Sequence, residues 1–205
     1  MSKKLLTVAT LIAAAATVMS GPAASKPTQP DPPVIVVTNL SGSAFVQSPS
    51  GSQRDLVSTQ VLHSGDIVTT GDDSLAVIML ADVGKVTLGP TTSVTTFTKG
   101  TDLSMELGAG MLCVQTDKPG VSVNAGSMTL ATIDRSTAFN LEQNTGDTKL
   151  AVYKGSVRAT TPNDSPMTFR AGAAAASSSG VSVHEIPMAS IAVDFAALNC
   201  PEVRP

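Results

Sequence analysis

Four aspartates in the first half of the chain are the first candidates for chemistry: Asp66, Asp72, Asp73 and Asp82. Closely spaced carboxylates can bind calcium, and a facing pair can act as acid and base on a glycosidic bond. The alternating Asp-x-Asp-x-Asp loop with a later Glu is missing here, and neighbouring side chains on a strand point to opposite faces. Asp beside Gly is typical of turns. We therefore predict that these residues shape turns and hold no metal.

The two histidines of the chain, His63 and His184, could serve as the base of a serine hydrolase. The Gly-x-Ser-x-Gly elbow of such enzymes is missing around the Gly-Ser pairs at 126–127 and 155–156. Both histidines are predicted to be surface or hydrogen-bonded side chains. The Gly-Ala-Gly run at 108–110 precedes no helical pattern that could bind phosphate, so it is predicted to be a turn between strands. These patterns predict a protein that is not an enzyme and binds no cofactor.

Cys113 and Cys200 are the only cysteines, and they lie 87 positions apart. In an oxidising compartment they could form a disulfide that closes a long loop and holds the C-terminus. The alternative is a buried thiol at Cys113 and an exposed thiol at Cys200. A Cys-x-x-Cys motif is missing, which excludes thiol redox catalysis and a zinc site of that type. We predict the disulfide.

The N-terminal residues are typical of a secretory signal peptide. Lys3 and Lys4 precede an apolar run at 5–19, and small residues follow at 20–24. We predict a signal peptide at 1–24 and a proline-rich linker at 25–33. The alternative is an uncleaved anchor. No other apolar run approaches the roughly 20 residues that span a bilayer, so we expect no membrane span after cleavage and a periplasmic or secreted protein.

The composition of the 205-residue chain narrows the function classes further. The formal net charge is −3 and charged residues make up only 14%, which excludes the basic surface that nucleic-acid binding needs. Aromatic residues make up 3% and tryptophan is missing, which counts against single-stranded nucleic acid and against the ring stacking typical of carbohydrate binding. Hydrophobic residues make up 42%, enough for a core in a domain of this length.

The elements that must position these residues are short strands. From 34 to 170 the chain alternates β-branched and apolar segments with Gly, Asp, Asn and Pro. The run at 75–80 is apolar throughout and is predicted to be buried on both faces, whereas 102–107 alternates and is predicted to be half-buried. We predict an all-β domain at 34–170, either a two-sheet, jelly-roll-like sandwich or a short solenoid-like stack of strands.

The C-terminal part, 171–205, is predicted to be an Ala/Ser-rich loop and a tail. The loop is expected at 171–180, because Ser and Gly follow the alanines. One more strand is expected at 181–186. The spacing of the apolar residues at 189–198 is compatible with a short helix.

Between about residues 40 and 172 the order of several motifs resembles that of FecR-like domains. These are a Gly-Asp-x-apolar-x-Thr-Gly turn at 65–71, an Asp-Gly turn at 82–84, an apolar segment around 107–114 and a Val-x-x-Gly-x-Val segment at 152–157. At Ser136 the chain departs from the glycine that is usual in the family. The family-motif turn residues are Gly65, Asp66, Thr69, Gly71, Asp82, Gly84, Gly110 and Gly155.

The resemblance implies an extracytoplasmic β-sandwich or solenoid-like module. The best-known FecR proteins sit in the inner membrane and relay the occupancy of an outer-membrane transporter to a cytoplasmic sigma factor. Here the apolar segment starts at Leu5, so we expect no cytoplasmic region that could hold a sigma factor, and the relay role is not carried over.

We therefore expect an exported, non-enzymatic binding or scaffold module of the cell envelope whose partner is another envelope protein. Strand edges in such a domain are suited to pairing with a partner chain. Two alternatives stay open: a carbohydrate-binding or hydrolytic envelope protein, and a membrane-anchored remnant of a transmembrane signalling regulator. The sequence leaves the oligomeric state open.

Overall fold

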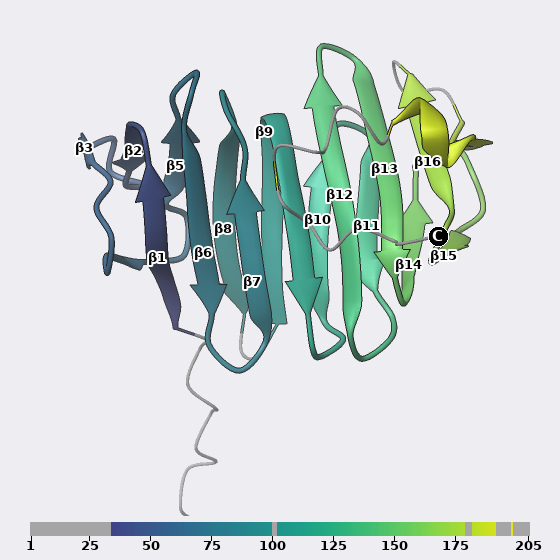
Figure 1. The fold of residues 1–205 in the computed structure, drawn as a ribbon, viewed down its shortest axis with the longest axis horizontal. Coiled ribbons are helices and arrows are strands. Elements are labelled where there is room, and N and C mark those ends of the chain that lie inside the picture. Colours follow the sequence, from purple (N-terminus) through teal and green to yellow (C-terminus); the bar gives the residue numbers. More distant parts are fainter. Residues whose placement is uncertain (1–33, 100–101, 179–181, 192–197, 199–205) are drawn as a thin grey trace, which may run out of the picture.

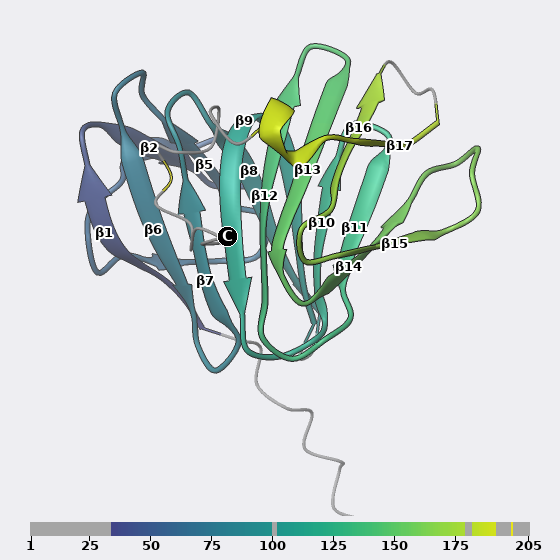
Figure 2. The same ribbon diagram turned by 45° about the vertical axis from the view of Figure 1, so that its right-hand side comes forward.

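The computed structural model describes residues 34–99, 102–178, 182–191 and 198. These residues form two open β-sheets that pack face to face, with sheet A in front and sheet B behind in Figure 1 and the two layers separating in Figure 2. The all-β prediction is confirmed, and the two-sheet sandwich is the architecture observed. The predicted signal peptide and linker at 1–33 lie outside the described residues.

Both sheets run without a break from one edge to the other. Sheet A contains, in spatial order, β4 (Val61–Leu62), β1 (Ile35–Ser41), β6 (Leu75–Leu80), β7 (Gly84–Leu88), β9 (Asp102–Thr116), β12 (Thr137–Asn144), β13 (Asp147–Lys154), β16 (Ala174–Ser178) and β17 (His184–Ile186). Sheet B contains β3 (Gln53–Asp55), β2 (Ala44–Gln47), β5 (Ile67–Thr70), β8 (Ser93–Lys99), β9, β10 (Val121–Ala125), β11 (Met128–Thr132), β14 (Ser156–Thr160) and β15 (Met167–Arg170).

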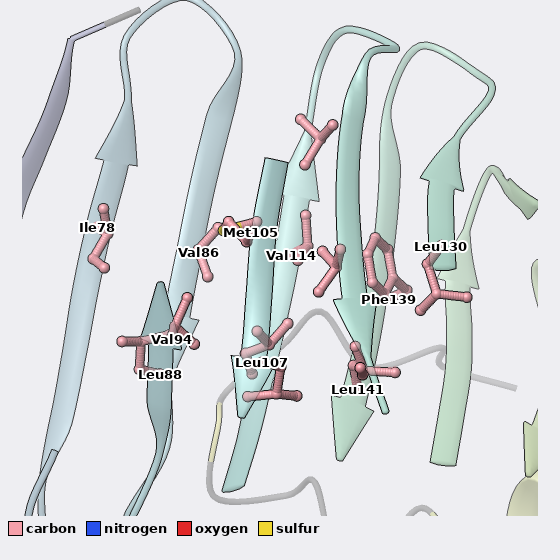
Figure 3. Packing of buried hydrophobic residues seen from close by; sticks show 14 of the residues in the cluster. Ile78, Val86, Leu88, Val94, Met105, Leu107, Val114, Leu130, Phe139 and Leu141 are labelled. Carbon is pink, nitrogen blue, oxygen red and sulfur yellow. The ribbon is translucent and has the colours of Figure 1, made fainter. Parts of the chain in front are cut away.

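The core lies between the sheets and takes every second side chain of most strands, because alternate residues of a strand point to opposite faces. Figure 3 shows this packing for core residues that include Ile78 of β6, Met105 of β9 and Phe139 of β12. The predicted alternation in 102–107 is confirmed, since Leu103, Met105 and Leu107 are all buried in the core. Burying aliphatic side chains in this way supplies most of the stabilisation that a sandwich has.

Strand β6 is buried on one face only, so the prediction that both of its faces are buried is wrong. Ala76, Ile78 and Leu80 point into the core, whereas Met79 is 42% exposed on the other face. The apolar run misled the prediction because an antiparallel sheet can leave one face open to solvent. The apolar residues on that open face of β6 matter for the site described below.

Strand β9 belongs to both sheets. Its first half pairs with β8 in sheet B, and its second half pairs with β7 and β12 in sheet A. The predicted turn at 108–110 is therefore wrong, because these residues continue the strand. Gly110 lets the strand change sheets: its φ of +90° favours glycine, and a Cβ there would lie 2.5 Å from the Thr92 Cα.

Buried threonines supply hydrogen bonds where β9 changes sheets. The Thr92 hydroxyl lies 3.0 Å from both the backbone N and the backbone O of Met111. The Thr70 hydroxyl accepts a hydrogen bond from the Thr92 N–H at 2.9 Å and donates one to the Gly89 carbonyl at 2.6 Å. Backbone groups that leave a regular ladder need such partners when they are buried. These side chains therefore fix the place of the crossing.

The predicted loop at 171–180 is wrong for its central residues, which form β16 between β13 and β17. Ala174 and Ala175 are buried on opposite faces of sheet A, and their small side chains fit between the layers that cover them. The predicted strand at 181–186 is confirmed in part by β17. Of the segment at 189–198 that was predicted to be compatible with a short helix, the structure describes a single 3-10 turn, η1 (Met188–Ser190), and residues 192–197 lie outside the described part.

We predict that Ser136→Gly raises the free energy of unfolding by about 0.5–1 kcal/mol. Ser136 adopts a φ of +65° in the turn before β12, a conformation that is unfavourable for residues with a Cβ. Urea unfolding of the two proteins measures the difference. Ser136→Ala keeps the Cβ and should not stabilise, so an equal gain from alanine would contradict this explanation.

Candidate functional site on the outer face of sheet A

The outer face of sheet A carries the side chains that point away from the core, and the strand register places them in rows. One row crosses the sheet through Val36, Met79, Lys85, Gln115 and Ala138. The next row crosses it through Val77, Thr87, Cys113, Asn140, Ala151, Ala174 and Ile186. Because β6, β7, β9 and β12 are paired on both sides, these rows sit on a regular part of the sheet.

Ile191 and Leu198 cover the centre of this face. Both are buried in one cluster with Cys113, Ala151 and Ala174. The half-buried residues packed against this cluster are Met111, Tyr153, Ile186 and Met188. We call residues 188–191 and Leu198 the C-terminal cover. The covered strands carry small side chains here, which lets the cover approach the sheet closely.

The Leu198 side chain packs against the sheet beside Gly89 and Met111. A Cβ added to Gly89 would lie 2.9 Å from the Leu198 Cδ2 and 2.5 Å from the Met111 Cγ. The φ of Gly89 is not in the left-handed region. Glycine is therefore favoured here because a larger side chain would collide with Met111 and Leu198, and not because of the backbone conformation. Gly89 therefore leaves room for an aliphatic side chain on this face.

Two polar side chains of β12 are buried on the same face. Asn140 donates a hydrogen bond from Nδ2 to the Tyr153 hydroxyl at 3.1 Å, but its Oδ1 has no partner among the described residues. Glu142 accepts a hydrogen bond from Asn144 at 2.6 Å, and its second oxygen lies 3.2 Å from the Lys149 Nζ. The carboxylate charge is therefore compensated, whereas one amide oxygen is left without a donor.

The ultraviolet absorbance of Tyr153 is a probe of the cluster under the C-terminal cover. Tyr153 is the only tyrosine of the chain and the chain has no tryptophan, so this signal comes from one side chain. Partial burial raises the pKa of its hydroxyl above the ordinary value of about 10, and the hydrogen bond from Asn140 opposes this in part. A raised pKa favours the neutral phenol in the folded state. The contribution of this group to stability is therefore complete below pH 10 and is lost as the pH rises through the folded pKa.

We predict that the tyrosinate absorbance of the folded protein rises with a midpoint above pH 10, and that the midpoint returns to about 10 in urea. Spectrophotometric titration measures both midpoints directly. The Asn140→Ala variant should still titrate above 10, since burial is the larger cause. Equal midpoints in the folded and unfolded protein would contradict the burial of this hydroxyl.

An uncovered apolar strip continues from the covered zone toward the N-terminal edge of sheet A. We define it as Val36, Val61, Val77 and Met79. Val61 is 46% exposed and Met79 is 42% exposed, whereas Val36 and Val77 are half-buried. Exposed apolar side chains that adjoin one another are typical of surfaces that bind another protein.

A hollow of about 440 Å³ lies beside Met79 of this strip. Its lining includes Met79 from the strip, the two lysines Lys85 and Lys154, and Asp117. The remaining lining residues are Gly84, Gln115, Thr116, Ser136, Thr137 and Ala138. The lining carries two positive charges, on Lys85 and Lys154, and one negative charge, on Asp117, so its net charge is positive.

The predicted family-motif residues are spread over turns and strands of the sandwich and do not meet in one site. Gly65 (φ +88°) and Asp66 form the turn before β5, where the Asp66 Oδ2 accepts a hydrogen bond from the His63 N–H at 2.9 Å. Asp82 lies in the turn between β6 and β7, and Gly155 lies between β13 and β14. The prediction that these aspartates shape turns agrees with their positions.

Three of the family-motif residues lie within strands. Thr69 is in β5, Gly84 is the first residue of β7 and Gly110 is inside β9, so describing them as turn residues is wrong. Gly71 follows β5 and donates a hydrogen bond to the Ser43 carbonyl at 2.8 Å. Glycine is needed at position 84 because a Cβ there would overlap the Gln115 carbonyl.

The residues considered as candidates for catalysis or metal binding do not lie close together. His63 precedes β5 and its side chain is largely exposed, whereas His184 is an exposed residue of β17 at the other end of the sandwich. Among the described residues, no three His, Cys, Asp or Glu side chains gather as they would around a metal. Cys113 lies under the C-terminal cover, and Cys200 lies outside the described part. No described helix is long and apolar enough to cross a membrane.

The comparison with protein families finds a match inside the sandwich. The sequence model of the family described as FecR protein matches residues 66–158, which run from the residue before β5 into β14 and include strands of both sheets. This part of the chain is similar to the FecR family. The matched residues include Lys85, Cys113 and Tyr153 on the outer face of sheet A.

The fold of this chain also occurs in solved structures. Two crystal structures of a "putative anti-sigma factor" from Parabacteroides distasonis superpose with a TM-score of 0.52 each, at 14% sequence identity. The match covers 62% of this chain and 62% of each of those chains. At this identity the likeness is one of fold. No curated protein matches the chain.

Proposed function

We propose that the protein is an exported, non-enzymatic binding module of the cell envelope that docks another envelope protein on the outer face of sheet A. The observation that carries the proposal is the apolar strip beside the two-lysine hollow. The similarity of residues 66–158 to the FecR family supports a regulatory or scaffold role, and the similar solved structures are described as those of a "putative anti-sigma factor".

Capture of a partner from the native envelope by the full-length protein tests this function. We compare Val61→Asp/Met79→Asp, which places charge on the strip, with Phe45→Asp/Phe97→Asp, which places the same charge on sheet B. The four side chains are 46%, 42%, 39% and 41% exposed, so both variants should fold. A partner lost by the first variant and kept by the second supports the proposal. A partner kept by both, or lost only by the second, overturns it.

Export from the cytoplasm is part of the proposal and rests on the N-terminal sequence. Lys3, Lys4, the apolar run at 5–19 and the small residues at 20–24 support removal of a signal peptide. Intact mass of the protein isolated from the envelope fraction tests it. We expect a chain that begins between residues 21 and 26. A mass that includes residues 1–19 would show the anchored alternative instead.

We further propose, and predict for measurement, a disulfide between Cys113 and Cys200. The support is the burial of Cys113 in one cluster with Leu198, which precedes Cys200 by two residues. Closing so long a loop stabilises by about 4 kcal/mol in the chain-entropy account. Thiol titration of denatured, unreduced protein should find none. Two titratable thiols would contradict the disulfide. The Cys200→Ser variant is the positive control, because it should show one titratable thiol, that of Cys113.

A further inference from the structure

The hollow beside Met79 has a lysine at each end. Lys85, Gln115, Ala138 and Lys154 are register partners in turn on β7, β9, β12 and β13, so they form one row on the outer face of sheet A. All four line the hollow. Because neighbouring strands lie about 4.8 Å apart, the backbones of the two lysines are about 14 Å apart. Ala138 has the shortest side chain of the row, which leaves space for a ligand between the two flexible lysine side chains.

The two lysines carry positive charges that no carboxylate of the described residues neutralises. None of the salt bridges within the described part of the chain involves Lys85 or Lys154. Lys85 is half-buried and Lys154 is exposed, so both ammonium groups are within reach of a ligand. Asp117 also lines the hollow, but it forms no salt bridge with either lysine. The hollow is therefore complementary in charge to an anionic ligand.

Two hydroxyl groups of the hollow already use their hydrogens within the protein. Thr116 donates a hydrogen bond to the Lys118 carbonyl at 2.6 Å, and Thr137 donates one to the Asp134 carbonyl at 3.1 Å. A hydroxyl has a single hydrogen to donate. These two side chains therefore add no donor for an anion, and the recognition of a negative charge falls to the lysines.

The row of the lysines continues into the apolar strip. Met79 is the register partner of Lys85, and Val36 is the register partner of Met79. Met79 is 42% exposed. From Met79 to Lys154 the row crosses four strand spacings, or about 19 Å, which is the length of an extended chain of about six residues. A chain along this row would meet an apolar side chain first and then two ammonium groups.

We infer that the hollow binds an extended acidic segment of the partner, which lies across the strands along this row. An apolar side chain of the segment packs on Met79, and two carboxylates at the following alternate positions bind Lys85 and Lys154. Alternate side chains of an extended chain point to one side and lie about 7 Å apart, so both carboxylates fit between the two lysine backbones. The inference rests on the proposed function for the existence of a partner and adds the chemistry of the segment that docks.

The probe for this inference is a short fluorescent peptide with the sequence Leu-Thr-Glu-Thr-Glu between Gly-Ser flanks. Its binding to the full-length protein is measured by fluorescence anisotropy. A matched peptide carries Gln at both Glu positions and so keeps the shape without the charge. Free glutarate is tested as a competitor, because a hollow that binds small dicarboxylates would also use the two lysines.

Four full-length proteins are compared with these ligands. They are the wild type, Lys85→Gln/Lys154→Gln, Arg54→Gln/Arg158→Gln and Asp117→Asn. Arg54 and Arg158 are exposed residues of β3 and β14 in sheet B, so this control removes the same charge from the other sheet. Thermal melts establish that all four proteins fold.

We expect the Glu peptide to bind the wild type at least about tenfold more tightly than the Gln peptide, because each carboxylate meets an ammonium group. Lys85→Gln/Lys154→Gln should weaken its binding at least about tenfold, whereas Arg54→Gln/Arg158→Gln should stay within about twofold. Asp117→Asn should bind at least as tightly as the wild type, since it removes a charge that repels the ligand.

Equal binding of the two peptides, no binding at all, or equal losses from the two double variants overturns the inference. Weaker binding to Asp117→Asn also overturns it, and so does glutarate that binds as tightly as the Glu peptide, because the ligand is then a free dicarboxylate. The test needs no cellular partner, so its outcome separates from that of the envelope capture. If Val61→Asp/Met79→Asp loses a partner while the Glu peptide fails to bind, docking on this face stands and the acidic segment does not. If the Glu peptide binds as expected and that variant keeps its partner, the acidic site exists without the proposed function.

Discussion

Ile78→Asp is expected to unfold the domain. Ile78 is 2% exposed, and its register partners Val37 and Val86 on the neighbouring strands are fully buried. An aspartate in this place would be a buried charge without a partner, which costs several kcal/mol. Because small domains have about 5–15 kcal/mol of stability in all, circular dichroism and thermal melting should show little or no cooperative folding.

The neighbouring residue provides the control for this prediction. Met79 follows Ile78 on β6 but points to the outer face, where it is 42% exposed. Met79→Asp should change the free energy of unfolding by no more than about 0.5 kcal/mol. If both variants unfolded equally, or if Ile78→Asp melted like the wild type, the assignment of the two faces of β6 would be wrong.

Gly110→Ala is expected to destabilise the protein by about 3 kcal/mol or more. Gly110 adopts a φ of +90° where β9 passes from sheet B to sheet A. The added Cβ would lie 2.5 Å from the Thr92 Cα and 2.7 Å from the Thr91 carbonyl oxygen. These are backbone atoms of the segment that holds the crossing, so they cannot move aside without breaking its hydrogen bonds. Denaturant unfolding measures the loss.

Gly108→Ala is the matched control two residues away on the same strand. A Cβ at Gly108 would meet only the Ser93 carbonyl oxygen at 3.7 Å, and its φ is not in the left-handed region. We expect a change within about 0.5 kcal/mol. Similar losses at both glycines would show that the crossing at Gly110 does not depend on its backbone conformation.

The sandwich was predictable because strand periodicity and turn residues are local signals. The alternation of Leu103, Met105 and Leu107 predicts the half-buried first part of β9 correctly. What failed depends on contacts far apart in the sequence. The 108–110 run resembles a turn, but its conformation is set by Thr92, which no local pattern indicates. Strand β16 was missed because alanines have low strand preference and become a strand here only through pairing with β13 and β17.

The candidate site was less predictable than the fold. Asp66 and His63 are residue types that could bind a metal or act as an acid or base, but in the structure their hydrogen bond stabilises the turn before β5. Cys113 is buried in one cluster with Leu198, and its predicted disulfide with Cys200 stays a prediction. The face around Tyr153 and Asn140 was not predicted. Only the register of the strands shows that Asn140 lies in one row with Cys113, Ala151 and Ala174.

Site-specific photo-crosslinking in the native envelope tests the central claim most directly, because it reports which face of the full-length protein touches a partner. A photoreactive residue is placed at Met79 on sheet A or at Phe97 on sheet B, which are exposed to nearly the same extent. The account predicts a defined adduct with another envelope protein from position 79 and none from position 97. An adduct from position 97 alone, or from neither position, would contradict docking on the outer face of sheet A.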